Sequence, residues 1–207
     1  LIADIMNEAG VPSGVVNIVT GTGVEAGAPL AEHMGVDKIV FTGSTVTGQS
    51  IVRASAGNLK RVSLELGGKC PAIIDDTADL DTAVASIAVG KMYNAGQICL
   101  SPDYVLVQHD LRAAFVERYQ EWLRSNVYVV GAFNPGSMSH FIDKRNQARV
   151  NHYVEEAVHK GAVLAGTYRF DEDALSMEPA VLLDVPDDAA ILEEEIFGPV
   201  LPVLTFD

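Results

Sequence analysis

Hydrophobic and polar positions over residues 1–66 alternate between the helical and the strand pattern. Apolar residues recur at helical spacing over residues 2–9, and Gly10 and Pro12 end this predicted helix. Continuous apolar runs predict short buried strands at 15–19, 38–41 and 61–64. The segments between them predict helices over about 23–34 and 45–56. Strands that alternate with helices through short links are typical of a parallel, doubly wound α/β sheet with right-handed crossovers.

After the pair Gly67-Gly68 the pattern starts again. Further apolar runs predict strands at 72–74, 104–107, 162–164, 180–183 and 200–204. Predicted helices run from a cap at Asp79 or Asp81 to Met92, from 111 to 123, and from 146 to 159 with Gly161 as C-cap. We therefore expect two domains, one over residues 1–66 and one over residues 67–207.

Composition and charge exclude several classes of protein. The 207 residues are 48% hydrophobic and 20% charged, as in a globular protein. The net charge is −14, and residues 167–207 hold 11 acids against Arg169 alone, a net of −10 (1 − 11). We interpret this acidic run as a solvated surface that repels nucleic acid and anionic membranes. No apolar stretch approaches the roughly 18 residues of a membrane span, and no leader opens the chain. We therefore expect a soluble, cytoplasmic protein.

The cysteines and histidines of the chain predict neither a disulfide framework nor a metal site. The two cysteines do not form a disulfide framework, and the five histidines lack ligand spacing, so the sequence predicts no metal site. Cys70 flanks a predicted strand and is expected to be a small buried hydrophobe. Tyr119 and Trp122 fit a helix stripe that faces the core. Cys99 differs from Cys70, because Gly96 and Pro102 break the segment around it.

Three short runs carry the candidate chemistry. Cys99 closes the run 94–99 at 34 positions (99 − 65) after Glu65, which ends a predicted strand. A thiolate attacks carbonyl carbon readily, and a half-buried carboxylate with a raised pKa is a useful general base. A cap or a salt bridge is the alternative role for Glu65. The third run contains Glu195, which lies 96 positions (195 − 99) after the thiol and is followed by apolar residues.

The run 43–48 joins a predicted strand to a helix. Main-chain N–H groups at a helix N-terminus bind phosphate, and glycine permits close approach, so Gly43, Ser44 and Gly48 are candidate cofactor contacts. The spacing is not that of the common dinucleotide fingerprint, and on spacing alone an ordinary turn is the more frequent meaning. A second glycine pair, Gly21 and Gly23, is interpreted as a turn.

Taken in order, the runs 64–69, 94–99 and 194–199 resemble the aldehyde dehydrogenase superfamily, and the likeness extends to 15–21 and 41–45. The resemblance implies a nucleotide-binding domain fused to a catalytic domain. It implies Cys99 as the nucleophile and Glu65 as the base that activates the deacylating water. It also implies NAD or NADP as cofactor, with Glu195 on the nicotinamide ribose and Phe197 beside the nicotinamide ring. The implied reaction oxidises an aldehyde to a carboxylic acid through a cysteine thiohemiacetal and a thioester.

The continuation 99–104 is most similar to the coniferyl-aldehyde and class 3 branch, which implies an apolar or aromatic aldehyde. Cys70 stands where many relatives carry Ser. The chain starts at Leu1 and ends just after a strand-like run, so we expect a piece of a longer protein that is inactive alone. The resemblance also implies an upstream Asn that helps bind the oxyanion and an upstream Lys near the adenine ribose. Neither motif lies within this chain. For the complete protein the resemblance implies a homodimer or homotetramer. A cysteine acyltransferase or hydrolase and an inactive scaffold remain alternatives.

Overall fold

The computed structural model describes residues 1–207, which separate into two compact units, Leu1–Gly67 and Gly68–Asp207. The boundary between the two units falls inside the Gly67-Gly68 pair. No helix is long and apolar enough to cross a membrane.

The first unit contains a small parallel sheet with its helices. Its elements are α1 (Ile2–Glu8), a π-helical turn (Gly23–Gly27) continuing into α2 (Ala28–Glu32), β1 (Lys38–Thr42), α3 (Thr45–Ser55) and β2 (Arg61–Glu65). β1 and β2 pair in parallel from Lys38 opposite Arg61 to Thr42 opposite Glu65. The crossover through α3 joins the two strands, as the alternation in the sequence predicts.

The predicted strand at 15–19 is wrong. These residues have no strand partner, and all five are exposed. Apolar and β-branched composition favours an extended chain, but a strand exists only when a neighbour accepts and donates its main-chain hydrogen bonds. In this unit β1 and β2 pair only with each other, and the segment 15–19 joins neither of them.

The second unit is built on a five-stranded sheet in the order β3-β4-β11-β10-β7. Its strands are β3 (Pro71–Ile74), β4 (Tyr104–Gln108), β7 (Val163–Ala165), β10 (Ala180–Leu183) and β11 (Val200–Phe206). All neighbours are parallel except β7, which is antiparallel to β10. The last strand of the chain therefore lies at the centre of the sheet. Two short hairpins, which the sequence did not predict, pair β5 (Tyr128–Val129) with β6 (Ala132–Phe133) and β8 (Phe170–Asp171) with β9 (Ser176–Met177).

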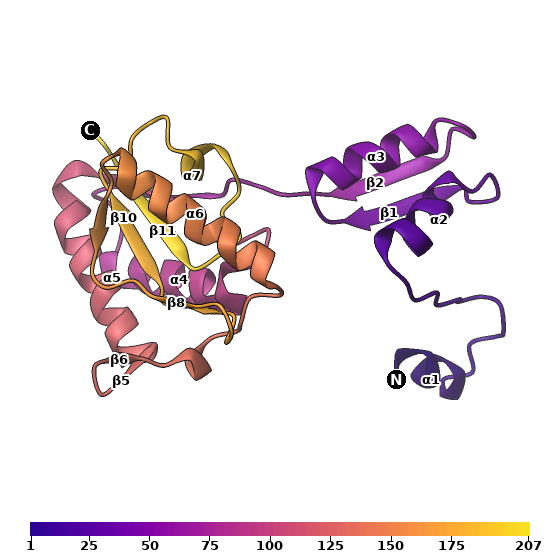
Figure 1. Ribbon diagram of the computed structural model, residues 1–207, viewed down its shortest axis with the longest axis horizontal. Helices are drawn as coiled ribbons and strands as arrows, with labels where there is room; N and C mark the ends of the chain where they lie inside the picture. The colour runs from indigo at the N-terminus through magenta and orange to yellow at the C-terminus, as the bar shows by residue number, and fades with distance from the viewer. The chain divides into compact units, whose positions relative to one another are not determined.

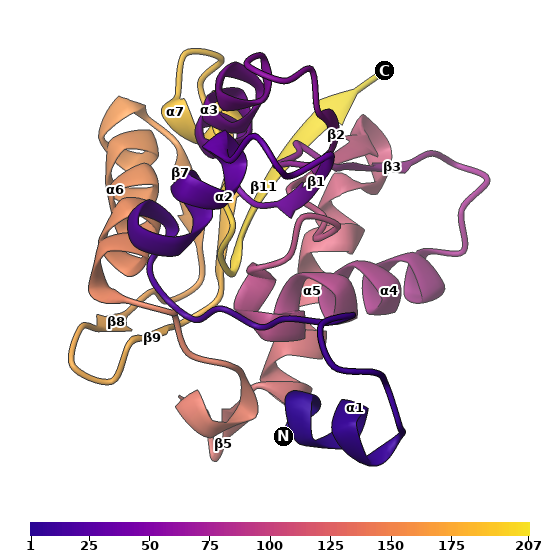
Figure 2. The same cartoon turned by 90° about the vertical axis from the view of Figure 1, so that its right-hand side faces the viewer.

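Helices cover both faces of this sheet (Figures 1 and 2). One face carries α4 (Leu80–Met92) and α5 (Arg112–Asn126), and the other carries α6 (Lys144–Lys160) and the short α7 (Ala190–Glu193). Three 3₁₀ turns complete the unit, at Tyr93–Gly96, His109–Leu111 and Pro135–Ser137. The predicted caps are confirmed. The side chain of Asp79 accepts a hydrogen bond from the Thr82 N–H, and Gly161 ends α6 with a φ of 118°.

Each face of the sheet has its own hydrophobic core. Val105 and Val203 point to the side of α4 and α5, where Phe115 and Tyr119 are also buried. Leu182 and Val200 face α6, whose Val150 is fully buried. Apolar residues on both faces of the central strands are what a parallel sheet between two helical layers requires. This core holds the loops that carry Cys99 and Glu195.

Candidate active site

Cys99 lies in a turn that follows the strained end of α4. Asn94, Ala95 and Gly96 take successive left-handed conformations, with φ of 49°, 54° and 73°. Left-handed backbone is costly for residues with a Cβ and persists only where surrounding contacts impose it, often at functional sites. The chain beyond this kink places Cys99 on the surface, where its thiol is exposed.

The side chain of Gln97 holds the loop that carries Cys99. Its side chain is 9% exposed, and its Nε2 donates to the carbonyl oxygens of Asn94 and His140, both at 3.0 Å. Its Oε1 accepts from the Ile142 N–H at 3.2 Å. Asn94 in turn donates to the Gln97 carbonyl at 3.1 Å. A buried amide that satisfies both its donor and its acceptor groups rigidifies the segment that contains it.

Gly68 brings the three predicted runs together within the second unit. Its N–H donates to Oε1 of Glu195 at 3.3 Å. A Cβ added at Gly68 would lie 3.5 Å from the Cys70 Sγ and 3.6 Å from the Cys99 carbonyl oxygen. Segments near residues 68, 99 and 195 are thus neighbours, although the sequence separates them by up to 127 positions.

The main chain around Glu195 is held on both sides. Asp103 accepts from the Ile196 N–H at 3.1 Å, while Arg149 donates to the carbonyl oxygens of Glu195 and Ile196 at 3.1 and 3.0 Å. Burial raises the pKa of the Glu195 carboxyl group, against the opposing hydrogen bond from Gly68. Phe197 lies two residues further on and has a φ of 51°, so its main chain is left-handed as well.

Two lysines, Lys69 and Lys91, lie close to Asp103 and Glu195. Lys69 pairs with the buried Asp103 and donates to the carbonyl oxygens of Ile191 and Glu194 at 2.6 and 2.7 Å. Lys91 is fully buried, and its Nζ has no hydrogen-bond partner. Burial lowers the pKa of Lys91 to about 8, although the charge of Asp103 acts in the opposite direction.

Glu65 ends β2 in the first unit. Its side chain is exposed, so the expectation of a half-buried carboxylate is wrong for this unit taken alone. The reason is the alternation of the two-stranded sheet, in which every second residue of β1 and β2, including Glu65, is exposed. The main chain at Glu65 accepts a hydrogen bond from the Gly43 N–H at 3.0 Å. Glu65 therefore neighbours the strand–helix junction at Gly43.

Ser44 caps α3, with its Oγ accepting from the Thr47 N–H at 3.3 Å. The first turn of this 11-residue helix contains no acid that would oppose an anion. The two glycines serve packing in this unit. A Cβ at Gly43 would lie 2.5 Å from the Phe41 ring, and one at Gly48 would lie 2.7 Å from Leu66. Their predicted cofactor contacts stay predictions.

The sequence missed Gln97, Asp103, Lys91 and Arg149 as parts of the site. Lys69 ends the run 64–69 and Asp103 lies in the continuation 99–104, and these places were the available signal. Arg149 lies on the amphipathic helix α6 and Lys91 near the end of the mostly apolar helix α4, and nothing local marks either as part of the site. Cys70 is half-exposed rather than buried, because its thiol lies against the Cys99 loop instead of inside the sheet core.

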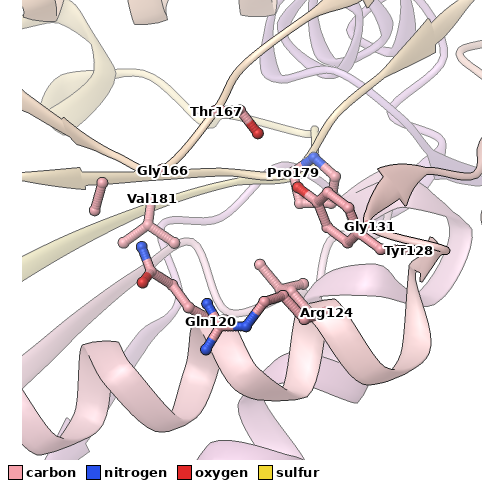
Figure 3. A pocket seen from close by; sticks show the side chains of 10 residues that line it. Gln120, Arg124, Tyr128, Gly131, Gly166, Thr167, Pro179 and Val181 are labelled. Atoms are coloured by element: carbon pink, nitrogen blue, oxygen red, sulfur yellow. The ribbon is translucent and has the colours of Figure 1, made fainter.

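A pocket of about 400 Å³ opens elsewhere in the second unit, between α5 and the segments that follow β7 and precede β10 (Figure 3). Gln120 and Arg124 extend from the helix, and Tyr128 and Thr167 line the opposite side. The Tyr128 and Thr167 hydroxyls both donate to the buried Glu178 at 2.7 Å. None of the predicted site residues lines this pocket, which is therefore separate from the candidate active site.

The model of the aldehyde dehydrogenase family matches residues 1–207, and the chain belongs to this family. Aldehyde dehydrogenase family 2 member C4 of Arabidopsis thaliana is 40% identical, over 99% of this chain and 41% of that protein. A solved structure described as an E. coli NADP dependent enzyme matches with a TM-score of 0.92 and 36% identity, covering all of this chain and 43% of that one. Betaine aldehyde dehydrogenase from Staphylococcus aureus in complex with NAD+ matches with a TM-score of 0.88 and 32% identity, over all of this chain and 42% of that one. The chain thus spans about two fifths of its relatives' length, and the predicted fold class is confirmed.

Proposed function

We propose that the complete protein oxidises an aldehyde to a carboxylic acid with NAD or NADP, using Cys99 as nucleophile and Glu65 as base. The observation that carries the proposal is the convergence on Gly68 of the Cys99 loop and the Glu195 carboxylate. A reactive thiol beside a group suited to sugar hydroxyls is what cysteine-based oxidation with a nicotinamide cofactor requires. Family membership supports the same reaction class.

In this proposal the chain's own groups take the following steps. The exposed Cys99 thiolate attacks the aldehyde carbonyl carbon and forms a thiohemiacetal. The Cys99 N–H makes no hydrogen bond within the chain, so it is available to the developing oxyanion. Loss of hydride from the thiohemiacetal leaves a thioester on Cys99. Glu65 then removes a proton from the water that hydrolyses this thioester and releases the acid.

Two groups fit the cofactor that accepts the hydride. The N-terminus of α3, with Ser44 and no acid in its first turn, suits a phosphate. The Oε2 atom of Glu195 makes no hydrogen bond within the chain, and a carboxylate with an available oxygen suits ribose hydroxyls. Phe197 lies two residues after Glu195 and has a left-handed main chain. We propose that NAD or NADP binds through these residues, since solved relatives include an enzyme described as NADP dependent and one in complex with NAD+.

An apolar or aromatic aldehyde as substrate, a homodimer or homotetramer, and a cytoplasmic location are part of the same proposal. The substrate rests on the likeness of residues 99–104, and the oligomeric state rests on family membership. A cysteine acyltransferase would instead need a His beside the thiol. His140 reaches the loop only through its main-chain carbonyl, which accepts from Gln97.

The test uses the complete protein with an aldehyde series and either cofactor, and follows reduced nicotinamide by absorbance. Cys99→Ala should abolish its formation, and Cys70→Ser should retain it. Limited iodoacetamide labelling with peptide mapping gives an independent readout, in which Cys99 reacts before the half-exposed Cys70. Cofactor reduction that survives in Cys99→Ala, or thioester hydrolysis without cofactor as the main reaction, would refute the proposal.

A further inference from the structure

The two cysteines of the chain lie against each other. The Cys70 Sγ is 3.3 Å from the Cys99 carbonyl oxygen, a contact in which the thiol donates. The same two atoms lie 3.5 and 3.6 Å from the position that a Cβ on Gly68 would occupy. The absence of a side chain at Gly68 therefore leaves the space in which the two residues meet.

The geometry points to a modification site: we infer that Cys70 is a resolving thiol that forms a reversible intramolecular disulfide with Cys99 under peroxide. Disulfides join residues with Cα atoms roughly 5.5–6 Å apart. A side chain whose sulfur touches the carbonyl oxygen of the other residue is compatible with that separation. Cys99 is exposed in a turn, so rotation about its Cα–Cβ bond moves its Sγ without displacing a packed side chain.

The surroundings favour this chemistry. Cys99 is open to solvent, and thiol oxidation follows access and thiolate character. Lys91 supplies a buried cation nearby. Asp103 and Cys70 are among the groups near enough to Lys91 to interact with its charge.

The steps balance with a peroxide as the only oxidant. The Cys99 thiolate attacks one peroxide oxygen, the O–O bond breaks, and hydrogen peroxide leaves one hydroxide, so that Cys99 becomes a sulfenic acid. Cys70 loses its proton and attacks the Cys99 sulfur. The S–S bond forms, the S–O bond breaks, and the departing hydroxide takes up the Cys70 proton as one water. The hydroxide of the first step takes up the Cys99 proton as the other water. Two thiols and one hydrogen peroxide thus give one disulfide and two waters, and an added dithiol reverses the change.

The inference rests on the proposed function only in taking Cys99 as the reactive thiol, and its test needs no turnover. The complete protein is treated with hydrogen peroxide, and peptides are mapped by mass spectrometry without reduction. The expected product links the Cys70 and Cys99 peptides within one chain and disappears on addition of dithiothreitol. In Cys70→Ser, which keeps a donor for the Cys99 carbonyl, Cys99 should instead proceed to sulfinic and sulfonic acids that dithiothreitol does not reverse.

Mapping and activity separate the two claims. If the linked peptide forms but no aldehyde is oxidised, the disulfide stands and the proposed function fails. If peroxide drives Cys99 to sulfinic acid as fast in the parent protein as in Cys70→Ser, the inference is overturned. Disulfides that form only between chains overturn it as well. Circular dichroism of Cys70→Ser controls for folding, and Cys70→Ala provides a second variant if the serine variant does not fold.

Discussion

The main chain of Gly96 packs so closely on the Gly198 carbonyl that a Cβ on Gly96 would lie 2.3 Å from that oxygen. This contact joins the loop of Cys99 to the segment that follows Glu195. Because both partners are backbone, neither can rotate away as a flexible side chain would. The relative position of the two segments therefore depends on the absence of a single carbon atom.

Gly96→Ala should destabilise the complete protein and slow alkylation of Cys99. Gly131→Ala is the matched control, because Gly131 also has a positive φ (77°) but its Cβ would meet nothing within 4 Å. Left-handed strain costs about 1–2 kcal/mol at both positions. The clash adds to the cost only at Gly96. Urea unfolding of the two variants measures the difference, and equal losses of stability would contradict the importance of the contact.

Glu65→Gln in the complete protein should slow deacylation more than acylation, because the base is needed chiefly when water attacks the thioester. The steady-state rate should fall by a factor on the order of 10²–10⁴, while a pre-steady-state burst of reduced cofactor survives. Stopped-flow absorbance measures both phases, and Cys99→Ala, which should lose the burst, is the control. A burst that vanishes in Glu65→Gln while Cys99 still reacts with iodoacetamide would give Glu65 another role.

Cofactor affinity should weaken as the pH falls. In the proposed function Glu195 binds ribose hydroxyls as a carboxylate. Burial raises its pKa, so it takes up a proton at a higher pH than an ordinary glutamate. The KM for the cofactor should therefore rise on acidification, before exposed carboxylates titrate. Glu195→Gln should have a higher KM near neutrality that no longer depends on pH in this range. The exposed Glu194→Gln serves as control, and an unchanged pH profile in Glu195→Gln would exclude this role.

The buried Lys91 should make stability depend on alkaline pH. Its folded pKa of about 8 lies below the ordinary value of 10.5, so the unfolded chain holds more protons between these two values. The free energy of unfolding then rises with pH across that window, by up to about 3 kcal/mol. Urea titrations at several pH values should show this slope in the parent protein and in Lys144→Met, an exposed control. The slope should be absent from Lys91→Met, and its persistence there would disprove the assignment.

Local sequence determined most of the fold. Both helix caps were predictable because they act within three or four residues. Asp79 caps its helix through its side chain, and Gly161 ends its helix because glycine adopts the left-handed conformation easily. The run 15–19 shows where local prediction fails. Its apolar residues predict a strand, but a strand forms only when a neighbouring strand pairs with it. The hairpins β5–β6 and β8–β9 have two-residue strands, which are too short to show any alternation.

The site divides in the same way. The sequence analysis proposes Cys99, Glu65 and Glu195 because each stands in a short recognisable run. Gln97 and Arg149 work through carbonyl oxygens, which carry no signature of their own in a sequence. The packing of α4, α6 and the sheet brings Gln97 and Arg149 to the carbonyl oxygens that they contact. Position along the chain did not reveal the contact between Cys70 and Cys99 either, because 29 residues separate them.

The central place of β11 has a consequence for synthesis. A ribosome releases β3 and β4, and later β7 and β10, before the strand that joins the two halves. The joining contact pairs Val105 with Val203, 98 positions apart (203 − 105), and such distant pairings form slowly. Until that strand leaves the exit tunnel, the nascent chain presents two unpaired sheet edges to every other chain in the crowded cell. Chaperones that shield such edges would therefore act on this unit in the interval between the emergence of β10 and the emergence of β11.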